Sequence, residues 1–435
     1  LSLPPLVGRE RELATLERHL TGAHGERPVL ILAGEPGIGK TRLLREAARR
    51  GLSAGLAVLI SGGVRDPREP YAALRHLLRG YLREQDAANL HAWLDGCDWL
   101  ATLLPELAHG EPRALAVDRL PLDGQRDYVE AALARFLSNI AGSAGTLLIL
   151  DDLHLVDAAS LDLLTALARS PRERPARILA AYRDTELAPG SPLDRWLSDQ
   201  AAAGAASCRT LQPLDAAGAR ALLLALLAGG EPEPAEAIDR VTELSAGVPF
   251  YLVSYAEWLR AGRPEPVPWE IVRAVRGRLA GLPQAGQDML RRAAVAPLAL
   301  RDRPVAVLEA CCRAGLLRLN QDGAYVFTRD VIRQAILADL SSGERATLSR
   351  CTASETGTPM LDGDAGQSDA ELAARYLEQA GDRASDLGAW QQAVTAYRDA
   401  IERLERTGPS PEAARLRAKL DRRRQERPAS IADGS

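Results

Sequence analysis

Residues 34–41 have the composition of a phosphate-binding loop. They read Gly-x-x-x-x-Gly-Lys-Thr and lie between an apolar stretch and a predicted helix. Glycines let backbone N–H groups converge on phosphate oxygens, and a helix N-terminus adds a positive dipole end. The motif therefore predicts binding of ATP, or a closely related nucleoside triphosphate, together with Mg²⁺. The predicted nucleotide-contacting residues here are Gly34, Glu35, Pro36, Gly37, Ile38, Gly39, Lys40, Thr41 and Arg42.

Lysine usage singles out one residue of this loop. Of 54 lysines and arginines, only Lys40 and Lys419 are lysines. A position that keeps lysine against this bias is expected to need a compact ammonium rather than a planar guanidinium. We predict that Lys40 reaches the β- and γ-phosphates and that Thr41 binds Mg²⁺. The alternative is a Gly-rich turn with an incidental lysine.

A second motif ends an apolar strand in two carboxylates. Asp151 and Asp152 directly follow the apolar run 147–150. Ligands of parallel sheets bind at the carboxyl ends of the strands. We predict that Asp151 holds the Mg²⁺ shell and that Asp152 orients or deprotonates the attacking water. Acid pairs at strand ends are also common in solvated turns, so this interpretation depends on the phosphate loop upstream.

Two more side chains could belong to the same site. Arg183 directly follows another apolar stretch, and we predict that it senses the γ-phosphate, although a surface role is the alternative in an Arg-rich chain. His154 is either a polar neighbour of the site or, as we expect, a surface histidine. The predicted catalytic residues are Asp152, Lys40 and Arg183, and the predicted metal ligands are Thr41 and Asp151.

Strands that alternate with helices must position these side chains. Short apolar strands are predicted at 28–33, 56–60, 146–152, 177–182 and 208–211. Helices are predicted within 7–20, at 40–50, over most of 66–140, and from Ser160, as its cap, to 169. The alternation indicates an α/β fold with a parallel, doubly wound sheet. The pattern then becomes all-helical, with helices near 215–228, 234–246 and 249–261.

The rest of the chain predicts further helical parts. A Pro-rich hinge at 263–268 precedes helices and a β-hairpin, Leu316–Leu319 with Tyr325–Phe327, in a winged-helix-like layout. A flexible segment at 352–367, a helix pair at 369–405 and a basic helix or tail at 416–427 follow. The predicted domains are a nucleotide-binding domain (1–212), a helical lid (213–263), a winged-helix domain (264–350) and a helical segment with tail (351–435).

Composition excludes several classes of protein. Hydrophobic residues make up 46% and charged residues 26%, as in soluble globular chains. The net charge of −4 gives no general attraction to nucleic acids or anionic membranes. No apolar run reaches the roughly 18 residues of a membrane helix. Five scattered cysteines without a Cys-x-x-Cys pair favour a cytoplasmic protein without structural zinc or disulfides. The chain begins without Met, and we expect a piece of a longer protein.

Together these motifs resemble the STAND class of P-loop ATPases, which are AAA+-related signalling switches, and most closely the ATPase module of large LuxR-type transcriptional regulators. The resemblance is carried by Leu6–Glu10, the phosphate loop, Leu150–His154, Arg183 and Gly247–Phe250. It implies an ATP-binding, slowly hydrolysing switch with a helical lid and a winged helix. It further implies that Val7, Gly8 and Arg9 lie against the adenine and that Pro249 packs on the base or sugar.

The resemblance also bears on the C-terminal half. Arg329 stands where such proteins often have a histidine that touches bound ADP, so it either replaces that contact by reaching the β-phosphate or the contact is absent. Residues 369–405 resemble one tetratricopeptide-like (TPR-like) helix pair, which needs neighbouring repeats to bury its face. The C-terminal DNA-binding helix-turn-helix usual in LuxR-type proteins is not seen in this sequence.

Other functions stay open at this point. A ring-forming AAA+ remodeller or loader would need an arginine finger and a pore loop, neither of which the sequence identifies. A scaffold with structural nucleotide and a small-molecule kinase are further alternatives. The basic tail is expected to be a solvated helix face rather than a DNA-binding element. Expected partners are nucleotide, a second copy in the ATP state, and a signal molecule or protein.

Overall fold

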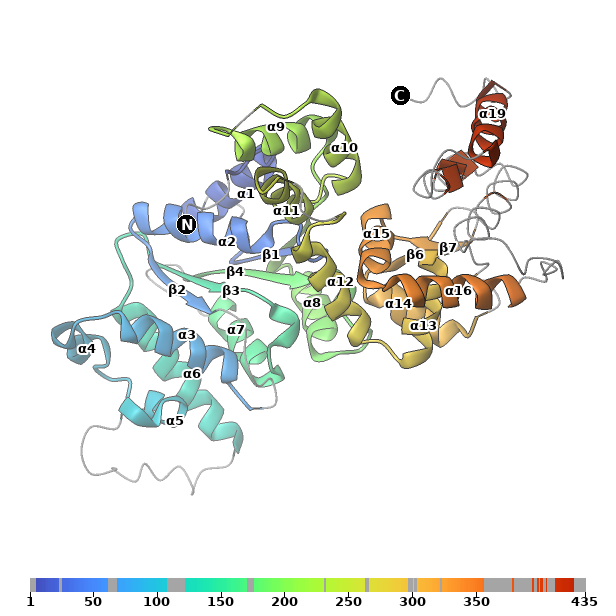
Figure 1. Ribbon diagram of the computed structural model, residues 1–435. Helices are drawn as coiled ribbons and strands as arrows, with labels where there is room; N and C mark the ends of the chain where they lie inside the picture. The colour runs from blue at the N-terminus through green and yellow to red at the C-terminus, as the bar shows by residue number, and fades with distance from the viewer. Residues whose placement is uncertain are drawn as a thin grey trace. The chain divides into compact units, whose positions relative to one another are not determined.

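The computed structural model divides into two compact units, Leu1–Arg263 and Pro264–Ser435 (Figure 1). The residues that it describes are 5–22, 26–61, 69–107, 122–169, 176–230, 232–262, 266–295, 300, 303–320, 323–355, 378, 393–394, 397–398, 400–401, 404 and 411–425. The finer domain boundaries stay predictions. Within these ranges, no helix has both the length and the apolar character that crossing a membrane requires.

The first unit is built on a parallel sheet of five strands, as predicted. The strands are β1 (Val29–Gly34), β2 (Ala57–Ser61), β3 (Thr146–Leu150), β4 (Ala176–Arg183) and β5 (Ala206–Thr210). Their order is β2-β3-β4-β1-β5, and every neighbouring pair is parallel. All carboxyl ends therefore meet at one edge of the sheet, where β1, β3 and β4 lie side by side.

Helices cover both faces of this sheet (Figure 1). Helices α1 (Glu10–Thr21) and α2 (Lys40–Ser53) bury one face, where Leu30 and Leu32 of β1 point. The other face, with Val29 and Ile31, is covered by α3 (Ala72–Arg83), α6 (Leu122–Asn139), α7 (Ala158–Arg169) and α8 (Pro192–Ala202). Because the central strands are apolar on both faces, they form continuous hydrophobic runs rather than alternating ones.

Short elements connect and extend this core. They are α4 (Ala87–Trp93), α5 (Leu100–Leu103) and the 3₁₀ turns η1 (Pro105–Leu107), η3 (Leu153–Leu155) and η4 (Asp184–Glu186). After β5, three helices pack on one another: α9 (Ala216–Leu227), α10 (Ala235–Ser245) and α11 (Pro249–Arg260). Their bounds agree with the helices expected near 215–228, 234–246 and 249–261.

The predicted cap of α7 was wrong. The helix begins at Ala158, so Ser160 lies in its first turn. The Asp157 carboxylate accepts hydrogen bonds from the Ser160 backbone N–H at 2.9 Å and from its hydroxyl at 2.7 Å. Asp157 prevails because a carboxylate is a stronger acceptor than a hydroxyl and its charge favours the helix N-terminus. The same carboxylate accepts from the Tyr71 N–H at 2.9 Å, which fixes the chain that enters α3.

The second unit is mainly helical. Its elements are α12 (Trp269–Ala280), α13 (Gln284–Val295), α14 (Val305–Arg313), β6 (Leu317–Leu319), β7 (Tyr325–Phe327), α15 (Asp330–Asp339), α16 (Ser342–Glu355) and α19 (Pro411–Gln425). Strands β6 and β7 pair antiparallel, where the hairpin was expected, and α15 packs on α12 and α13. Whether this arrangement is a winged helix stays a prediction.

The first four residues of the segment predicted to be flexible, 352–355, are helical, so the prediction was wrong for them. Residues 352–355 continue α16, because the first helix breakers, Gly357 and Pro359, come after them. Residues 356–367, the turn at 321–322 and most of the helix pair at 369–405 lie outside the described residues. The basic segment expected from Leu416 is helical as far as Gln425, and its Leu416 and Leu420 are buried with Tyr397.

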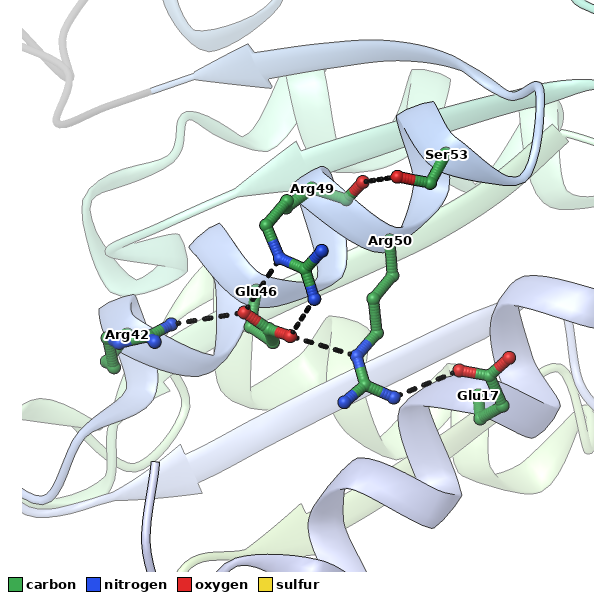
Figure 2. A network of polar contacts seen from close by, with 6 residues as sticks. All are labelled: Glu17, Arg42, Glu46, Arg49, Arg50 and Ser53. Atoms are coloured by element: carbon green, nitrogen blue, oxygen red, sulfur yellow. Dashed lines mark hydrogen bonds and ion pairs between the residues drawn. The ribbon is translucent and has the colours of Figure 1, made fainter. Parts of the chain in front are cut away.

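A network of charged side chains joins α1 to α2, the helix that follows the phosphate loop (Figure 2). The Glu46 carboxylate, whose side chain is 10% exposed, accepts from Arg49 at 2.6 Å, from Arg50 at 3.0 Å and from Arg42 at 3.5 Å. Arg50 also donates to Glu17 of α1 at 3.1 Å. These hydrogen bonds, led by that of Arg49, lower the pKa of Glu46 to about 2. The network therefore holds α2 against α1 at neutral pH.

Glu46→Gln is predicted to reduce the free energy of unfolding at pH 7 by about 1–2 kcal/mol, since three guanidinium groups lose a charged acceptor while solvent screens the exposed ones. A group with a lowered folded pKa contributes stability above its unfolded pKa and loses it as pH falls through the folded value. The difference from wild type should therefore be constant above about pH 4.5 and shrink toward pH 2. Urea denaturation across this range measures it. The exposed Glu257→Gln is the control, and a pH-independent difference would contradict the prediction.

Candidate nucleotide-binding site

The loop between β1 and α2 changes direction at glycines that have left-handed backbone conformations. Gly37 has φ 84° and Gly39 has φ 106°, values that strain other residues. The Gly37 carbonyl accepts a hydrogen bond from the Phe250 N–H at 3.1 Å. A Cβ added at Gly37 would lie 2.7 Å from the Phe250 Cβ. The loop thus depends on glycine both for its turn and for the close approach of α11.

The Lys40 side chain folds back over the start of this loop. Its Nζ donates to the Gly34 carbonyl at 2.6 Å and to the Glu35 carbonyl at 2.9 Å, and the residue is only 7% exposed. Burial lowers the pKa of Lys40 from its usual value, while the negative charge of Asp184 opposes that shift. The ammonium is therefore held at the mouth of the loop, where the predicted phosphates would lie.

Two residues 110 positions apart in sequence meet beside Lys40. The Thr41 hydroxyl donates to Asp151 Oδ2 at 2.5 Å, and Asp151 Oδ1 accepts the Asp152 N–H at 3.0 Å. A hydroxyl and a carboxylate oxygen are hard donors of the kind that Mg²⁺ binds. Their side-by-side position at the carboxyl edge of the sheet fits a shared Mg²⁺ ion, with remaining positions for water and phosphate oxygens.

Arg183 lies where the sequence predicted it, beside the loop. The parallel register of β1 and β4 places it opposite Gly34. Its Nε is 3.4 Å from Asp152 Oδ1, and its Nη1 donates to Glu186 Oε1 at 2.7 Å. Asp152 has a left-handed backbone, φ 52° and ψ 47°, which is uncommon outside glycine and is concentrated at functional sites. Two of the three predicted catalytic side chains, Asp152 and Arg183, are therefore paired.

His154 is not a surface histidine, so that prediction was wrong. Its side chain is 4% exposed, and its Nε2 lies 2.9 Å from Glu186 Oε2 and 3.9 Å from Asp152 Oδ1. Burial lowers its pKa despite the opposing charge of Glu186. The turn η3 buries Leu153 and folds His154 back toward β4. Sequence reasoning missed Glu186 altogether, although its position three residues after Arg183 was a usable signal.

Arg9 binds protein groups rather than standing free for a ligand. The residue is 5% exposed, and its Nη2 donates to the Ile38 carbonyl at 2.9 Å. Its Nη1 donates to the Gln212 carbonyl at 2.8 Å and pairs with Glu12 at 3.0 Å. Arg9 therefore ties the phosphate loop to the segment that leads into α9. The predicted contact of Val7, Gly8 and Arg9 with adenine stays a prediction.

The remaining predicted residues lie in three places. Pro249 is the first residue of α11, and its Cγ would be 4.0 Å from a Cβ on Gly39, so it lies against the loop. The Arg42 guanidinium points along α2 to Glu46 (Figure 2). Arg329 belongs to the second unit, at the residue before α15. Its predicted contact with nucleotide also stays a prediction.

The family comparison agrees with this geometry. Residues 5–180 match the AAA ATPase domain family. That match contains the phosphate loop, the two aspartates and most of β4. An uncharacterized protein of Rhizobium meliloti strain 1021 is 26% identical over 288 residues, which cover 59% of this chain. The match covers 25% of that protein, so this chain corresponds to about a quarter of the relative's length.

Two solved structures are similar to this chain to different extents. The Walker-type ATPase of Pyrococcus abyssi superposes with a TM-score of 0.50 at 17% identity, over 76% of this chain and 96% of that one. The Cdc6p structure from Pyrobaculum aerophilum covers 78% of this chain and 97% of its own, with a TM-score of 0.39 and 16% identity. With the sheet order above, the Pyrococcus structure supports an α/β P-loop NTPase fold.

Gly37→Ala should destabilise the first unit more than the strain of a left-handed alanine explains, because the new Cβ meets Phe250. Gly229→Ala is a matched control, since Gly229 has nearly the same φ, 85°, and open space around its Cβ position. We expect a loss of about 1 kcal/mol for the control and about 2–4 kcal/mol for Gly37→Ala. Chemical denaturation measures both. Equal losses would show that the contact with α11 is unimportant.

Proposed function

We propose that this chain is an ATP-binding, slowly hydrolysing switch of the STAND class that serves as the regulatory module of a transcriptional regulator. The observation that carries the proposal is the 2.5 Å hydrogen bond between Thr41 and Asp151, next to the Lys40 ammonium. It joins the phosphate loop to the strand-end carboxylate, as a site for a magnesium–triphosphate complex requires. The similarity to the Pyrococcus protein, a Walker-type ATPase, agrees with the proposal.

In this proposal, different parts of the site contact different parts of the nucleotide. The backbone N–H groups of the loop and the N-terminus of α2 hold the phosphate oxygens. Lys40 exchanges a carbonyl partner for the β- and γ-phosphates. Thr41 and Asp151 hold Mg²⁺, which when bound neutralises charge on those phosphates. Val7, Gly8 and Pro249 enclose the nucleoside from the side of α9 and α11.

Slow hydrolysis fits the pairing of Asp152 with Arg183. In our proposal Asp152 orients the attacking water, and Arg183 contacts the γ-phosphate. Asp152 Oδ1 lies 3.4 Å from Arg183 Nε, so its carboxylate is held in a fixed position and serves to position the water. A site of this kind retains ATP for long periods, as a switch needs.

The switching element is the three-helix group α9–α11, which acts as a lid. Its contact with the loop is the hydrogen bond from Phe250 N–H to the Gly37 carbonyl, so changes at the phosphates are transmitted to α11. ATP and ADP then stabilise different lid positions to different extents. The second unit, as a winged-helix-like and TPR-like arm, passes the change on, and the ATP state self-associates. We place this switch in the cytoplasm, where ATP and its transcriptional target would be found.

Lys40→Ala is expected to abolish binding of Mg²⁺–ATP, since the phosphates lose the only buried ammonium that the described residues place at the loop. Titration calorimetry with a non-hydrolysable ATP analogue measures this, with an expected loss of at least about 100-fold in affinity. Lys419→Ala removes the other lysine and is the control. Full affinity in Lys40→Ala would refute the site assignment.

Asp152→Asn should bind ATP with near wild-type affinity but release phosphate at least about 100-fold more slowly, because the amide cannot orient the water as a carboxylate does. A coupled phosphate-release assay and a parallel titration separate the two effects. Asp199→Asn, an exposed change on α8, is the control. Unchanged turnover would exclude Asp152 from the reaction. Fast turnover of wild type that requires oligomers would instead favour a remodelling ATPase.

A further inference from the structure

Four charged or polar side chains form a closed ring beside the phosphate loop. His154 Nε2 lies 2.9 Å from Glu186 Oε2, and Glu186 Oε1 accepts from Arg183 Nη1 at 2.7 Å. Arg183 Nε is 3.4 Å from Asp152 Oδ1, which is in turn 3.9 Å from His154. Two turns supply the ring: η3 after β3 and η4 after β4. Glu186 and His154 are the two members to which the proposed reaction gives no role.

In the ring, Arg183 contacts two carboxylates, those of Asp152 and Glu186. Arg183 follows the strand register to a position opposite Gly34, at the start of the loop. The shorter of these two contacts is the one with Glu186, and the Arg183 side chain is 39% exposed. A γ-phosphate must therefore compete with Glu186 for the same guanidinium.

His154 keeps Glu186 in place. A carboxylate 2.9 Å from Nε2 requires the proton on that nitrogen, so Nε2–H donates to Glu186. Nδ1 is then the bare nitrogen, and it is buried without a hydrogen-bond partner among the described residues. The side chain is 4% exposed and has little room to move. Glu186 is thus anchored on one oxygen and binds Arg183 with the other.

We propose that Glu186 is an acidic latch on Arg183 that weakens binding of ATP relative to ADP, with His154 as its positioning residue. This inference rests on the proposed function, because it requires Arg183 to contact the γ-phosphate. ADP lacks that phosphate, so ADP leaves the pair between Arg183 and Glu186 intact. ATP must break it, and the cost of breaking it lowers the affinity for the triphosphate alone. The latch biases the switch toward its ADP state.

The decisive measurement is the ratio of dissociation constants for ADP and for a non-hydrolysable ATP analogue, both with Mg²⁺. Glu186→Gln keeps the shape of the side chain and removes its charge. We expect the analogue to bind about 5-fold tighter or more, as for a typical coupling between two sites, while ADP affinity stays the same. His154→Asn should shift the ratio in the same direction by a smaller factor. Glu236→Gln, an exposed change on α10, should leave it unaltered.

A double-variant cycle tests whether the effect passes through Arg183. In the background of Arg183→Ala, Glu186→Gln should no longer change the ratio, since the latch has nothing left to hold. An unchanged ratio in Glu186→Gln alone, a shift toward ADP, or a shift that persists without Arg183 would each overturn the latch. The wild-type titration keeps the two proposals apart. If wild type binds neither nucleotide, the proposed function fails. If it binds both and the ratio does not respond, only the latch fails.

Discussion

The site depends on one constraint, the parallel order β3-β4-β1 at the centre of the sheet. Parallel strands deliver their carboxyl ends to a single edge, so the loop after β1, the aspartates after β3 and Arg183 of β4 converge without any direct sequence link. The register then fixes the details, because Gly34 lies opposite Arg183. Buried apolar runs on both faces hold the strands in this order. Thr41 and Asp151 can share a hydrogen bond only because hydrophobic burial elsewhere has already placed them.

Sequence reasoning predicted the parts of this site that are written in contiguous patterns. The phosphate loop, the strand that ends in Asp151 and the strand that ends in Arg183 each combine an apolar run with a polar end, and both halves are local. Ser160 was wrongly predicted as the cap because Asp157, three residues before it, can also cap the helix, and the outcome depends on which side chain is the stronger hydrogen-bond acceptor. The contact between His154 and Glu186 could not be predicted for another reason: the two residues belong to turns about 30 residues apart, and only the fold pairs them.

Arg9 shows a further limit of the sequence. Its partners at Ile38 and Gln212 are backbone carbonyls, which every residue has, so no residue type marks them. Through the same contacts Arg9 connects the phosphate loop to the segment that leads into α9. Glu46 has a related structural role in α2, the helix after the loop. It accepts hydrogen bonds from arginines of α2, and one of them, Arg50, also contacts α1 (Figure 2). Charged groups thus connect the loop to the segment before α9 and connect α2 to α1, while the hydrophobic clusters hold the sheet together.

The contacts of Lys40 have a thermodynamic consequence of their own. The Lys40 ammonium donates hydrogen bonds to the Gly34 and Glu35 carbonyls, so the protein itself supplies the partners that a bound phosphate would otherwise give to this ammonium. A preformed loop needs little ordering when a phosphate arrives, which favours rapid association. The entering phosphate, however, gains only the difference between its own attraction and that of the displaced carbonyls. In the function that we propose, the protein's own backbone therefore moderates the affinity, and nucleotide can leave without the loop having to unfold.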